Sequence, residues 1–339
     1  MINLIREYLE KIDAQKLGLK GNIRVQSVKS IGMGKSNINY LVIVNDKKFL
    51  FRVNIEPRNS TKSRREYESL KLIQKFGIAP IPYFIDDSMV NFPNSFIIID
   101  YLEGKSLDHH PYPHSKKIIK QLGKLCAKLH SINLDGTIKL KYSRCSKNNY
   151  LELINNEFSY IQNHIRNNEF KEKIKEAVKK LEKIKNANIS REKVFSQGDF
   201  CEQNIIYYKY ECYLIDFEDA SLTYPAAELA RIFVDFGRGG FNSLERKDFL
   251  REYYKIRNIA NKIKFEKEVE SFEPYILLFG LVWSIAHIIR IRNKEFDKEF
   301  LKNNNIRKDY SYTEYCIKKA IKNNLLDKSL INFDLERTI

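Results

Sequence analysis

The side chains best suited to chemistry lie between residues 197 and 218. Asp199 is followed five positions later by Asn204, and Asp216 stands at the end of the next apolar run. Phosphoryl transfer needs one carboxylate that orients an acceptor hydroxyl and takes its proton. It also needs a carboxamide and a second carboxylate that hold Mg²⁺ against nucleotide phosphates. Asp and Asn are also common as plain turn residues at hairpin ends, but ordered features on both sides of this stretch favour the catalytic interpretation.

This stretch resembles the aminoglycoside phosphotransferase and choline kinase family, a branch of the protein-kinase-like fold that phosphorylates small molecules. The family pattern is HGDxxxxN, followed by a hydrophobic strand that ends in IDW or IDF. This chain has QGDFCEQN at 197–204 and LIDFE at 214–218. The resemblance implies an ATP- and Mg²⁺-dependent small-molecule kinase, with Asp199 as the catalytic residue and Asn204 and Asp216 as metal ligands.

The resemblance extends over about residues 28–235 and also implies a nucleotide site. The residues that it assigns to that site are Gly32, Gly34, Ser36 and Asn37 in a loop that covers phosphates, Arg52 on a strand, its helical partner Glu66, and Asp100 and Leu102 in the segment that receives adenine. Small residues let backbone N–H groups approach phosphate oxygens, and a guanidinium binds phosphate in a bidentate way. Taken alone, the loop could be an ordinary turn, and Arg52 and Glu66 could be surface charges.

Three positions depart from the family pattern. Gln197 replaces the usual His, which removes an imidazole but leaves a group that can hydrogen-bond the catalytic loop. Glu228 replaces an Asp, which keeps the charge and changes its reach. Arg52 replaces the Lys of protein kinases, although Arg is familiar there among choline kinases.

The first hundred residues predict strands and a helix that could carry the nucleotide site. Residues 1–20 have an amphipathic helical pattern. The expected strands are Ile23–Val28, Ile38–Val44, Lys48–Val53, Tyr83–Asp86 and Phe96–Tyr101, with a short hairpin signal at Asn45-Asp46. Thr61–Lys75 has apolar residues at helical spacing. The pattern changes near residue 103, which predicts an N-terminal nucleotide-binding lobe over residues 1–102.

The remaining residues, 103–339, predict a larger and mainly helical lobe for catalysis and acceptor binding. The expected helices are Ser115–Ser131, Asn149–Asn167, Glu169–Lys185, one from Ala226, Leu244–Tyr254, Glu266–Arg292 and Tyr312–Asn324. The runs Asn204–Tyr208 and Cys212–Ile215 read as a hairpin around the candidate catalytic residues. The sequence thus predicts an α+β, bilobal protein-kinase-like fold.

Composition limits the location and partners of the protein. The 339 residues include 43% hydrophobic residues and only 13 Gly and 8 Pro, enough apolar material for a large core. Five widely spaced Cys without a CxxC pair indicate neither a disulfide framework nor a zinc knuckle, which fits the cytoplasm. The longest apolar stretch, Tyr275–Trp283, is too short to span a bilayer. We therefore expect no membrane association, and the sequence leaves the oligomeric state open.

The net charge of +16 is spread along the chain and is typical of a solvated Lys-rich surface. Because this charge repels polycations at long range, it favours a metabolite over an aminoglycoside as the hydroxyl acceptor. Choline, ethanolamine, a sugar such as methylthioribose and an amino alcohol such as homoserine all stay open. The alternative function is a non-catalytic kinase-like scaffold that binds nucleotide or RNA, but the complete set of Asp199, Asn204 and Asp216 argues against it, and we expect no nucleic-acid partner.

Two further groups of residues have both a structural and a functional interpretation. His109, His110 and His114 lie in the run HHPYPH, for which we expect a surface loop and not a metal site, because the prolines impose extended geometry. Tyr275, Phe279, Trp283 and His287 recur every four residues on one helical face. We expect core packing there, with an aromatic wall for a quaternary ammonium acceptor as the alternative.

Overall fold

The computed structural model describes residues 1–33, 36–55, 60–133, 146–184, 192–296, 301 and 306–332. The chain forms two compact units. The first unit comprises Met1–Lys141, Phe195–Ser221 and Asp248–Ile256, and the second comprises Tyr142–Val194, Leu222–Lys247 and Arg257–Ile339. The division into lobes at residues 102 and 103 that the sequence indicates stays a prediction.

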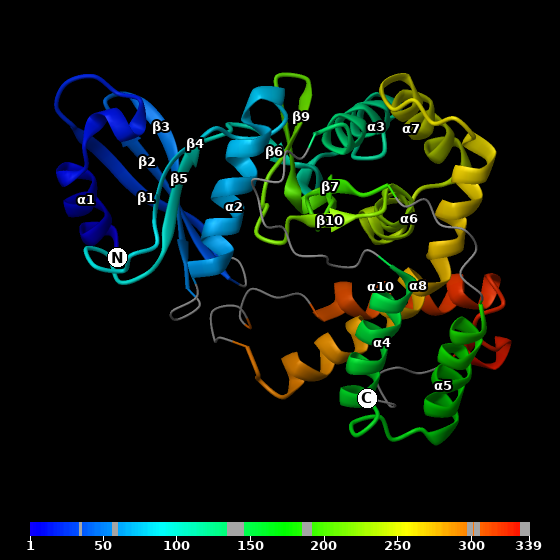
Figure 1. The fold of residues 1–339 in the computed structure, drawn as a ribbon. Coiled ribbons are helices and arrows are strands. Elements are labelled where there is room, and N and C mark those ends of the chain that lie inside the picture. Colours follow the sequence, from blue (N-terminus) through cyan, green and yellow to red (C-terminus); the bar gives the residue numbers. More distant parts are fainter. Residues whose placement is uncertain are drawn as a thin grey trace. The chain divides into compact units, whose positions relative to one another are not determined.

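A five-stranded antiparallel sheet dominates the first unit (Figure 1). Its strands, in spatial order, are β1 (Val25–Met33), β2 (Asn37–Val44), β3 (Lys47–Asn54), β5 (Phe96–Asp100) and β4 (Pro82–Asp86). Asn45 and Asp46 join β2 to β3 with positive φ angles of 48° and 64°, as a tight hairpin turn requires. The strands and the hairpin expected in this region are therefore confirmed, although β1 runs five residues beyond the expected end at Val28.

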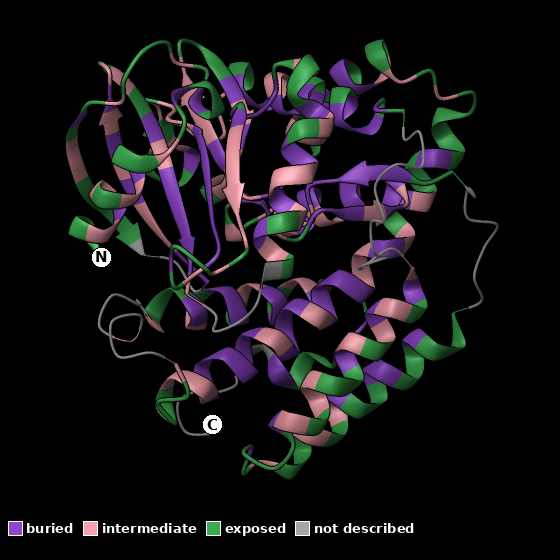
Figure 2. Ribbon diagram, turned by 60° about the vertical axis from the view of Figure 1, so that its left-hand side comes forward, coloured by how far each residue is buried: buried purple, intermediate pink, exposed green. Residues whose placement is uncertain are grey.

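Two helices accompany this sheet. The amphipathic α1 (Ile2–Lys11) buries Ile5 and Leu9 in the same apolar cluster as Phe49, Phe51 and Phe96 of the sheet. Figure 2 shows buried residues running along the strands. The second helix, α2 (Ser60–Ile73), contacts β3, β4 and β5 and carries Glu66 on a buried face. Burial of an apolar face fixes α1 against the sheet, whereas α2 buries Leu70 and Ile73 together with Ser63, Glu66 and Ser69.

The rest of the first unit holds a second, smaller sheet and a helix pair. The strands β6 (Lys105–Ser106), β8 (Ile205–Tyr208) and β9 (Glu211–Leu214) form a three-stranded sheet in that order. The β8–β9 pair is the hairpin expected around the catalytic residues. The helix α3 (Lys116–His130) approaches α7 (Ser243–Ile256) closely, because a Cβ on Gly123 would lie 2.3 Å from the Phe249 carbonyl oxygen.

The second unit is helical. It contains α4 (Lys147–Ile161), α5 (Asn168–Lys183), α6 (Pro225–Asp235), α8 (Lys262–Arg292) and α10 (Ile306–Lys322). The α8 helix contacts α4, α6 and α10 and supplies the central core. Glu228 is buried in the first turn of α6. The β-rich N-terminal region and the mainly helical C-terminal part predicted from the sequence are thus confirmed.

The apolar run Tyr275–Trp283 is only part of a much longer helix, α8. Within the described residues, α8 is long and apolar enough to cross a membrane, but 72% of its most apolar window is buried inside the protein. Tyr275 is buried and donates a hydrogen bond to the Leu181 carbonyl oxygen at 2.9 Å, which is core packing. Trp283 is half-buried and stacks on His287. The absence of membrane association and the cytoplasmic location stay predictions.

Helix ends and very short strands differ most from the sequence prediction. The α4 helix ends at Ile161 and not at the expected Asn167. The Asn167 side chain instead accepts a hydrogen bond from the Phe170 N–H and caps the start of α5. The paired strands β7 (Val194–Ser196) and β10 (Ser221–Thr223) were not predicted, since three residues carry too little alternation. Among the described residues, Cys126, Cys201, Cys212 and Cys316 are not joined in disulfides, and Cys145 lies outside those residues.

Candidate active site

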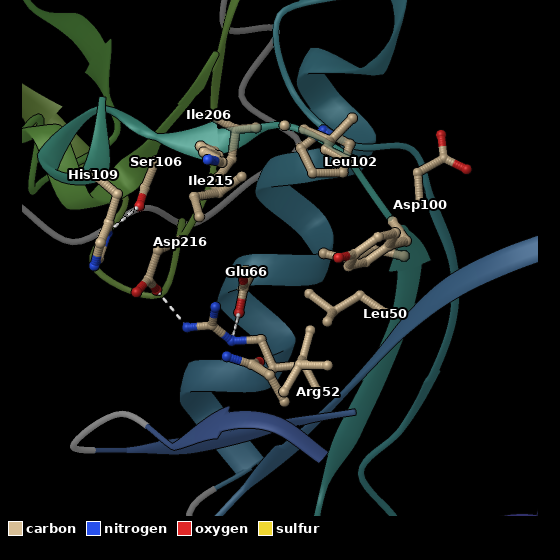
Figure 3. Close-up of a pocket in the computed structure, with 17 residues that line it drawn as sticks. Leu50, Arg52, Glu66, Asp100, Leu102, Ser106, His109, Ile206, Ile215 and Asp216 are labelled. Atoms are coloured by element: carbon tan, nitrogen blue, oxygen red, sulfur yellow. Dashed lines mark hydrogen bonds and ion pairs between the residues drawn. The ribbon is translucent and has the colours of Figure 1, made fainter. Parts of the chain in front are cut away.

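Arg52 is the centre of a buried ion cluster in the first unit (Figure 3). Its Nη2 lies 2.6 Å from Asp216 Oδ1 and 3.8 Å from Glu218 Oε2, and its Nε lies 3.1 Å from Glu66 Oε2. The Nε–Glu66 contact is an ion pair whose N–H is not aligned as a hydrogen bond. The β3 residue, its expected partner on α2 and one expected metal ligand are therefore together in the structure.

One guanidinium faces three carboxylates in this cluster, and the imbalance affects their protonation. Burial raises the pKa of Glu66; Arg52 opposes that rise, while Asp216 and Glu218 add to it. Burial also raises the pKa of Glu218, with Asp216 as the next cause. Burial lowers the pKa of Arg52, but Glu66, Asp216 and Glu218 outweigh it and the net pKa is raised, so the guanidinium stays charged. The surplus of negative charge suits an additional cation.

Glu218 joins this cluster to the loop between β1 and β2. Asn37 Nδ2 donates to Glu218 Oε2 at 2.8 Å, and Lys62 Nζ lies 3.9 Å from Glu218 Oε1. Lys62 Nζ also donates to Ser36 Oγ at 3.0 Å. The side chains of Asn37 and Ser36 therefore face a carboxylate and an ammonium. Sequence reasoning gave Lys62 no role and considered Glu218 only as an acidic group beside a choline acceptor, although LIDFE carries Glu218 next to the expected metal ligand.

Of the two glycines expected in the phosphate-covering loop, Gly32 lies near the end of β1. Gly32 pairs with Asn39 of β2, next to an irregularity in the register, and open space surrounds the position of a Cβ. Gly34 lies outside the described residues. The expected role of this loop in covering the nucleotide phosphates therefore stays a prediction.

Asp199 and Asn204 form a second group, on the segment between β7 and β8. Asn204 Nδ2 donates to both the carbonyl oxygen and Oδ2 of Asp199, at 3.0 Å each. The Cys201 thiol lies 3.7 Å from Asp199 Oδ2. The Ile215 N–H donates to the Asn204 carbonyl oxygen at 2.9 Å, which joins this segment to the residue before Asp216.

Two backbone positions explain why this local sequence is needed. Gly198 has a φ of 89°, and a Cβ there would lie 2.1 Å from the Asp219 carbonyl oxygen, so only glycine fits. Asp216 has a φ of 63°, a left-handed conformation that Asp tolerates better than most residues. Both candidate carboxylates thus stand beside sharp changes in backbone direction.

A cavity of about 590 Å³ leads to the Arg52 cluster within the same unit. Its apolar walls include Leu50, Ile99, Ile206 and Ile215, and Arg52, Glu66 and Asp216 line it as well (Figure 3). Asp100 and Leu102 are lining residues, and Tyr83 OH donates to Asp100 Oδ1 at 2.7 Å. An apolar slot that ends at a cation and a carboxylate suits a flat base with a phosphate chain.

Ser106 and His109 also line the cavity, and the sequence prediction had not assigned them to the site. His109 Nδ1 lies 3.2 Å from Ser106 Oγ and 3.0 Å from Asp108 Oδ1, and its side chain is 75% exposed. The expected surface position of this histidine is therefore compatible with a place at the rim of the cavity. The run HHPYPH drew attention to His109 only as a candidate metal ligand; closeness to the segment around Leu102 is the sequence feature that could have assigned both residues to the cavity.

The donor set fits Mg²⁺ bound jointly with phosphates. Across the described ranges, no group of three or more His, Cys, Asp and Glu side chains could hold a metal ion by itself. Mg²⁺ at nucleotide sites takes one or two protein carboxylates and completes its shell with phosphate oxygens and water. Asn204 and Asp216 offer one carboxamide and one carboxylate, which is consistent with that incomplete set.

The fold belongs to the protein-kinase-like class, as solved structures with a similar fold show. They include a choline kinase from Cryptosporidium parvum Iowa II (19% identity, 98% of each chain covered, TM-score 0.60). A choline/ethanolamine kinase family protein from Mesorhizobium loti shares 14% identity over 99% of this chain and 98% of that chain, with a TM-score of 0.63. A GDP complex of an aminoglycoside 2'-phosphotransferase-IIIa shares 14% identity over 95% and 98%, with a TM-score of 0.66.

The sequence model of the phosphotransferase enzyme family, APH, matches residues 27–260. The chain therefore belongs to this family and is an enzyme of the phosphotransferase class, as the resemblance of its catalytic stretch implied. A search of curated proteins found no match. At the identities above, the structural neighbours establish the shared fold, and the substrate has to be argued from the site.

Proposed function

We propose that the protein transfers the γ-phosphoryl group of ATP, with Mg²⁺, to a hydroxyl group of a small metabolite. The observation that carries this proposal is the apolar cavity that ends at Arg52 and Asp216 within the unit that also holds Asp199 and Asn204. Nucleotide and acceptor chemistry would then meet in one unit. Membership of the phosphotransferase family supports the reaction class.

The nucleotide would lie with its base in the apolar part of the cavity. Leu50 and Ile215 supply apolar walls, and the backbone around Asp100 and Leu102 would supply hydrogen bonds to the base edge. Arg52 would bind the phosphates, with Glu66 holding its guanidinium in place. Gly32, Gly34, Ser36 and Asn37 would cover the phosphates from the loop between β1 and β2.

Asp199 would orient the acceptor hydroxyl and take its proton. The amide of Asn204 holds the Asp199 carboxylate through Oδ2 and leaves its own carbonyl oxygen as the atom suited to a cation. Asn204 and Asp216 are the residues that would hold Mg²⁺, which when bound neutralises charge on the phosphates. Positioning and charge neutralisation would supply most of the rate.

The acceptor class follows from charge. With a net charge of +16, the protein repels a polycationic aminoglycoside at long range. Choline or ethanolamine carries a single charge and a sugar carries none, so this repulsion is small for them. We therefore propose a metabolic acceptor: choline, ethanolamine, a sugar or an amino alcohol.

The test is ADP release from Mg²⁺-ATP over choline, ethanolamine, methylthioribose, homoserine, common sugars and aminoglycosides. Asp199→Ala should abolish turnover and keep ADP affinity, because Asp199 acts on the acceptor. Asp13→Ala, at the exposed N-cap of the short 3₁₀ helix Ala14–Leu17, serves as the control and should keep full activity.

Near-normal turnover by Asp199→Ala would disprove the assignment. ADP binding by calorimetry without turnover of any acceptor would instead favour the alternative, a kinase-like scaffold that binds nucleotide or RNA. In that case, RNA binding with a steep salt dependence would distinguish the RNA scaffold.

A further inference from the structure

Gln197 is fully buried, with 0% exposure, and all parts of its carboxamide are engaged. Its Nε2 donates to the carbonyl oxygens of Ile215 at 2.9 Å and of Asp216 at 2.6 Å. Its Oε1 accepts the Asp199 N–H at 2.7 Å. One side chain therefore bonds directly to the backbone of both candidate carboxylate residues.

We infer that Gln197 is a positioning residue that holds the Asp199 segment and the Asp216 segment in one fixed arrangement. The inference rests on the proposed function, in which Asp199 handles the acceptor and Asp216 the metal. Phosphoryl transfer depends on the mutual placement of these groups. Gln197 itself touches no reacting atom in this scheme and acts only through the two backbones.

The structure shows why a carboxamide suits this position. A primary amide has two N–H donors and one carbonyl acceptor, so it can bond two carbonyl oxygens and one N–H at once. A neutral imidazole has one donor and one acceptor, and can replace only two of these three bonds. Gln197 therefore takes the place of the family's histidine with one bond more and without a charge that changes near neutral pH.

The backbone conformation gives these bonds their importance. Asp216 leaves β9 in the left-handed region at a φ of 63°, so its carbonyl oxygen is turned out of regular strand geometry. A buried carbonyl oxygen without a partner costs free energy comparable to a lost hydrogen bond. The Gln197 amide offsets that cost for two consecutive residues, and this favours the strained conformation at Asp216.

The test compares three substitutions at this position. Gln197→Leu removes all three bonds, Gln197→His restores two, and Gln197→Glu keeps the size but turns a carboxylate toward two carbonyl oxygens. We expect kcat to fall about 100-fold in Gln197→Leu, in line with a displacement of roughly 1 Å at the site. Gln197→Glu should fall similarly, and Gln197→His should lie between Leu and wild type. The affinity for ADP should change less than about threefold, because Gln197 lies outside the cavity lining.

Hydrogen exchange supplies a readout that does not depend on turnover. The Asp199 amide, bonded to Gln197 Oε1, should exchange faster in Gln197→Leu and retain part of its protection in Gln197→His. Gln74→Glu, an exposed position with the same isosteric change, is the control and should alter neither quantity.

Unchanged kcat in Gln197→Leu, or equal kcat in the His and Leu variants, would overturn the inference. So would a loss of activity that follows the fraction of unfolded protein, which a merely structural role predicts. If Gln197→Leu does not fold, the His and Glu variants still give the comparison. If no acceptor is turned over even by wild type, the proposed function fails, and the Asp199 exchange rates decide separately whether Gln197 holds this segment.

Discussion

At the scale of single residues, the Arg52 cluster concentrates charge where water is largely excluded. The Arg52 side chain is 8% exposed and that of Glu66 is 3% exposed. Removing one member of such a buried group leaves the other charge without compensation, which costs more than the pair itself contributes. The stability of the protein therefore depends on keeping the cluster complete, and the same cluster is suited to binding phosphate.

At a pH above the raised folded-state pKa of Glu66, Arg52→Met should lower the free energy of unfolding by about 3–5 kcal/mol, because the ionised Glu66 then stays buried beside two other carboxylates. Urea denaturation followed by circular dichroism measures this loss. The double variant Arg52→Met/Glu66→Gln should recover part of it, since no charge is then left at position 66. Arg24→Met, at a side chain that is 73% exposed, should change stability by less than about 0.5 kcal/mol. A double variant less stable than the single one would contradict this account.

The raised pKa of Glu66 predicts a pH dependence of stability. Burial is the main cause, Arg52 opposes it, and Asp216 and Glu218 add to it. The folded protein therefore holds this proton more tightly than the unfolded chain does. The contribution is complete below the ordinary Glu pKa of about 4.3 and is lost as the pH rises through the folded-state pKa.

Glu66→Gln removes this titration and keeps the size of the side chain. The stability of wild type relative to this variant should thus fall as the pH rises above about 4.3. Urea unfolding at several pH values measures the difference. Glu10→Gln, at an exposed position on α1, should run parallel to wild type. If the Glu66→Gln curve were also parallel to wild type, Glu66 would have no raised pKa.

At the scale of elements, close backbone approach determines how α3 is placed. Gly123 stands in the middle of a helix, where glycine costs about 1 kcal/mol relative to alanine. The structure explains this choice, because a Cβ would lie 2.3 Å from the Phe249 carbonyl oxygen of α7. The gain in helix propensity from alanine is smaller than the cost of separating the two helices.

Gly123→Ala should therefore destabilise the protein by about 1–3 kcal/mol, as overpacking does in other cores. Thermal unfolding gives the measurement. Gly239→Ala is the matched control, since the nearest atom to its Cβ position is at 3.8 Å, and it should have little effect. A Gly123→Ala protein as stable as wild type would show that α3 and α7 can separate at no cost.

The elements that the sequence predicted well are those with a strong pattern. The β2–β3 pair has an explicit turn residue in Asn45, α3 has apolar residues at helical spacing, and the β8–β9 hairpin has two short apolar runs. The strands β6, β7 and β10 have two or three residues each, too few for any period, and they exist because tertiary pairing supplies their hydrogen bonds. The long α8 was recognised, but its start at Lys262 precedes the expected Glu266.

At the scale of the whole molecule, the first unit is assembled from three separate parts of the chain. Residues 195–221, which carry Asp199, Asn204 and Asp216, join the N-terminal sheet that carries Arg52. The Leu214 N–H donates to the Ile78 carbonyl oxygen at 2.8 Å, one of the bonds that unite them. The candidate site thus depends on contacts between residues more than a hundred positions apart.

Net charge is a property of the whole molecule and predicts a salt effect. The net charge of +16 repels a polycationic aminoglycoside, and added salt screens this repulsion. If an aminoglycoside is an acceptor, its kcat/KM should therefore rise with salt concentration. If it is not an acceptor but inhibits the enzyme, its inhibition constant should fall. For a neutral sugar, kcat/KM should not change with salt concentration. Kinetics at several NaCl concentrations measures both. Weaker aminoglycoside binding at higher salt would mean that local attraction exceeds the overall charge.

The sequence by itself determined the class of chemistry, the α+β fold and most of the elements. Asp199, Asn204 and Asp216 have a characteristic spacing, and periodic apolar residues specify helices and strands locally. Only the tertiary structure showed that Arg52 meets three carboxylates, that Gln197 joins Asp199 to Asp216, and that Ser106 and His109 reach the cavity. These contacts join segments that are far apart in the sequence, and the sequence pattern alone does not show which distant segments lie close together in space.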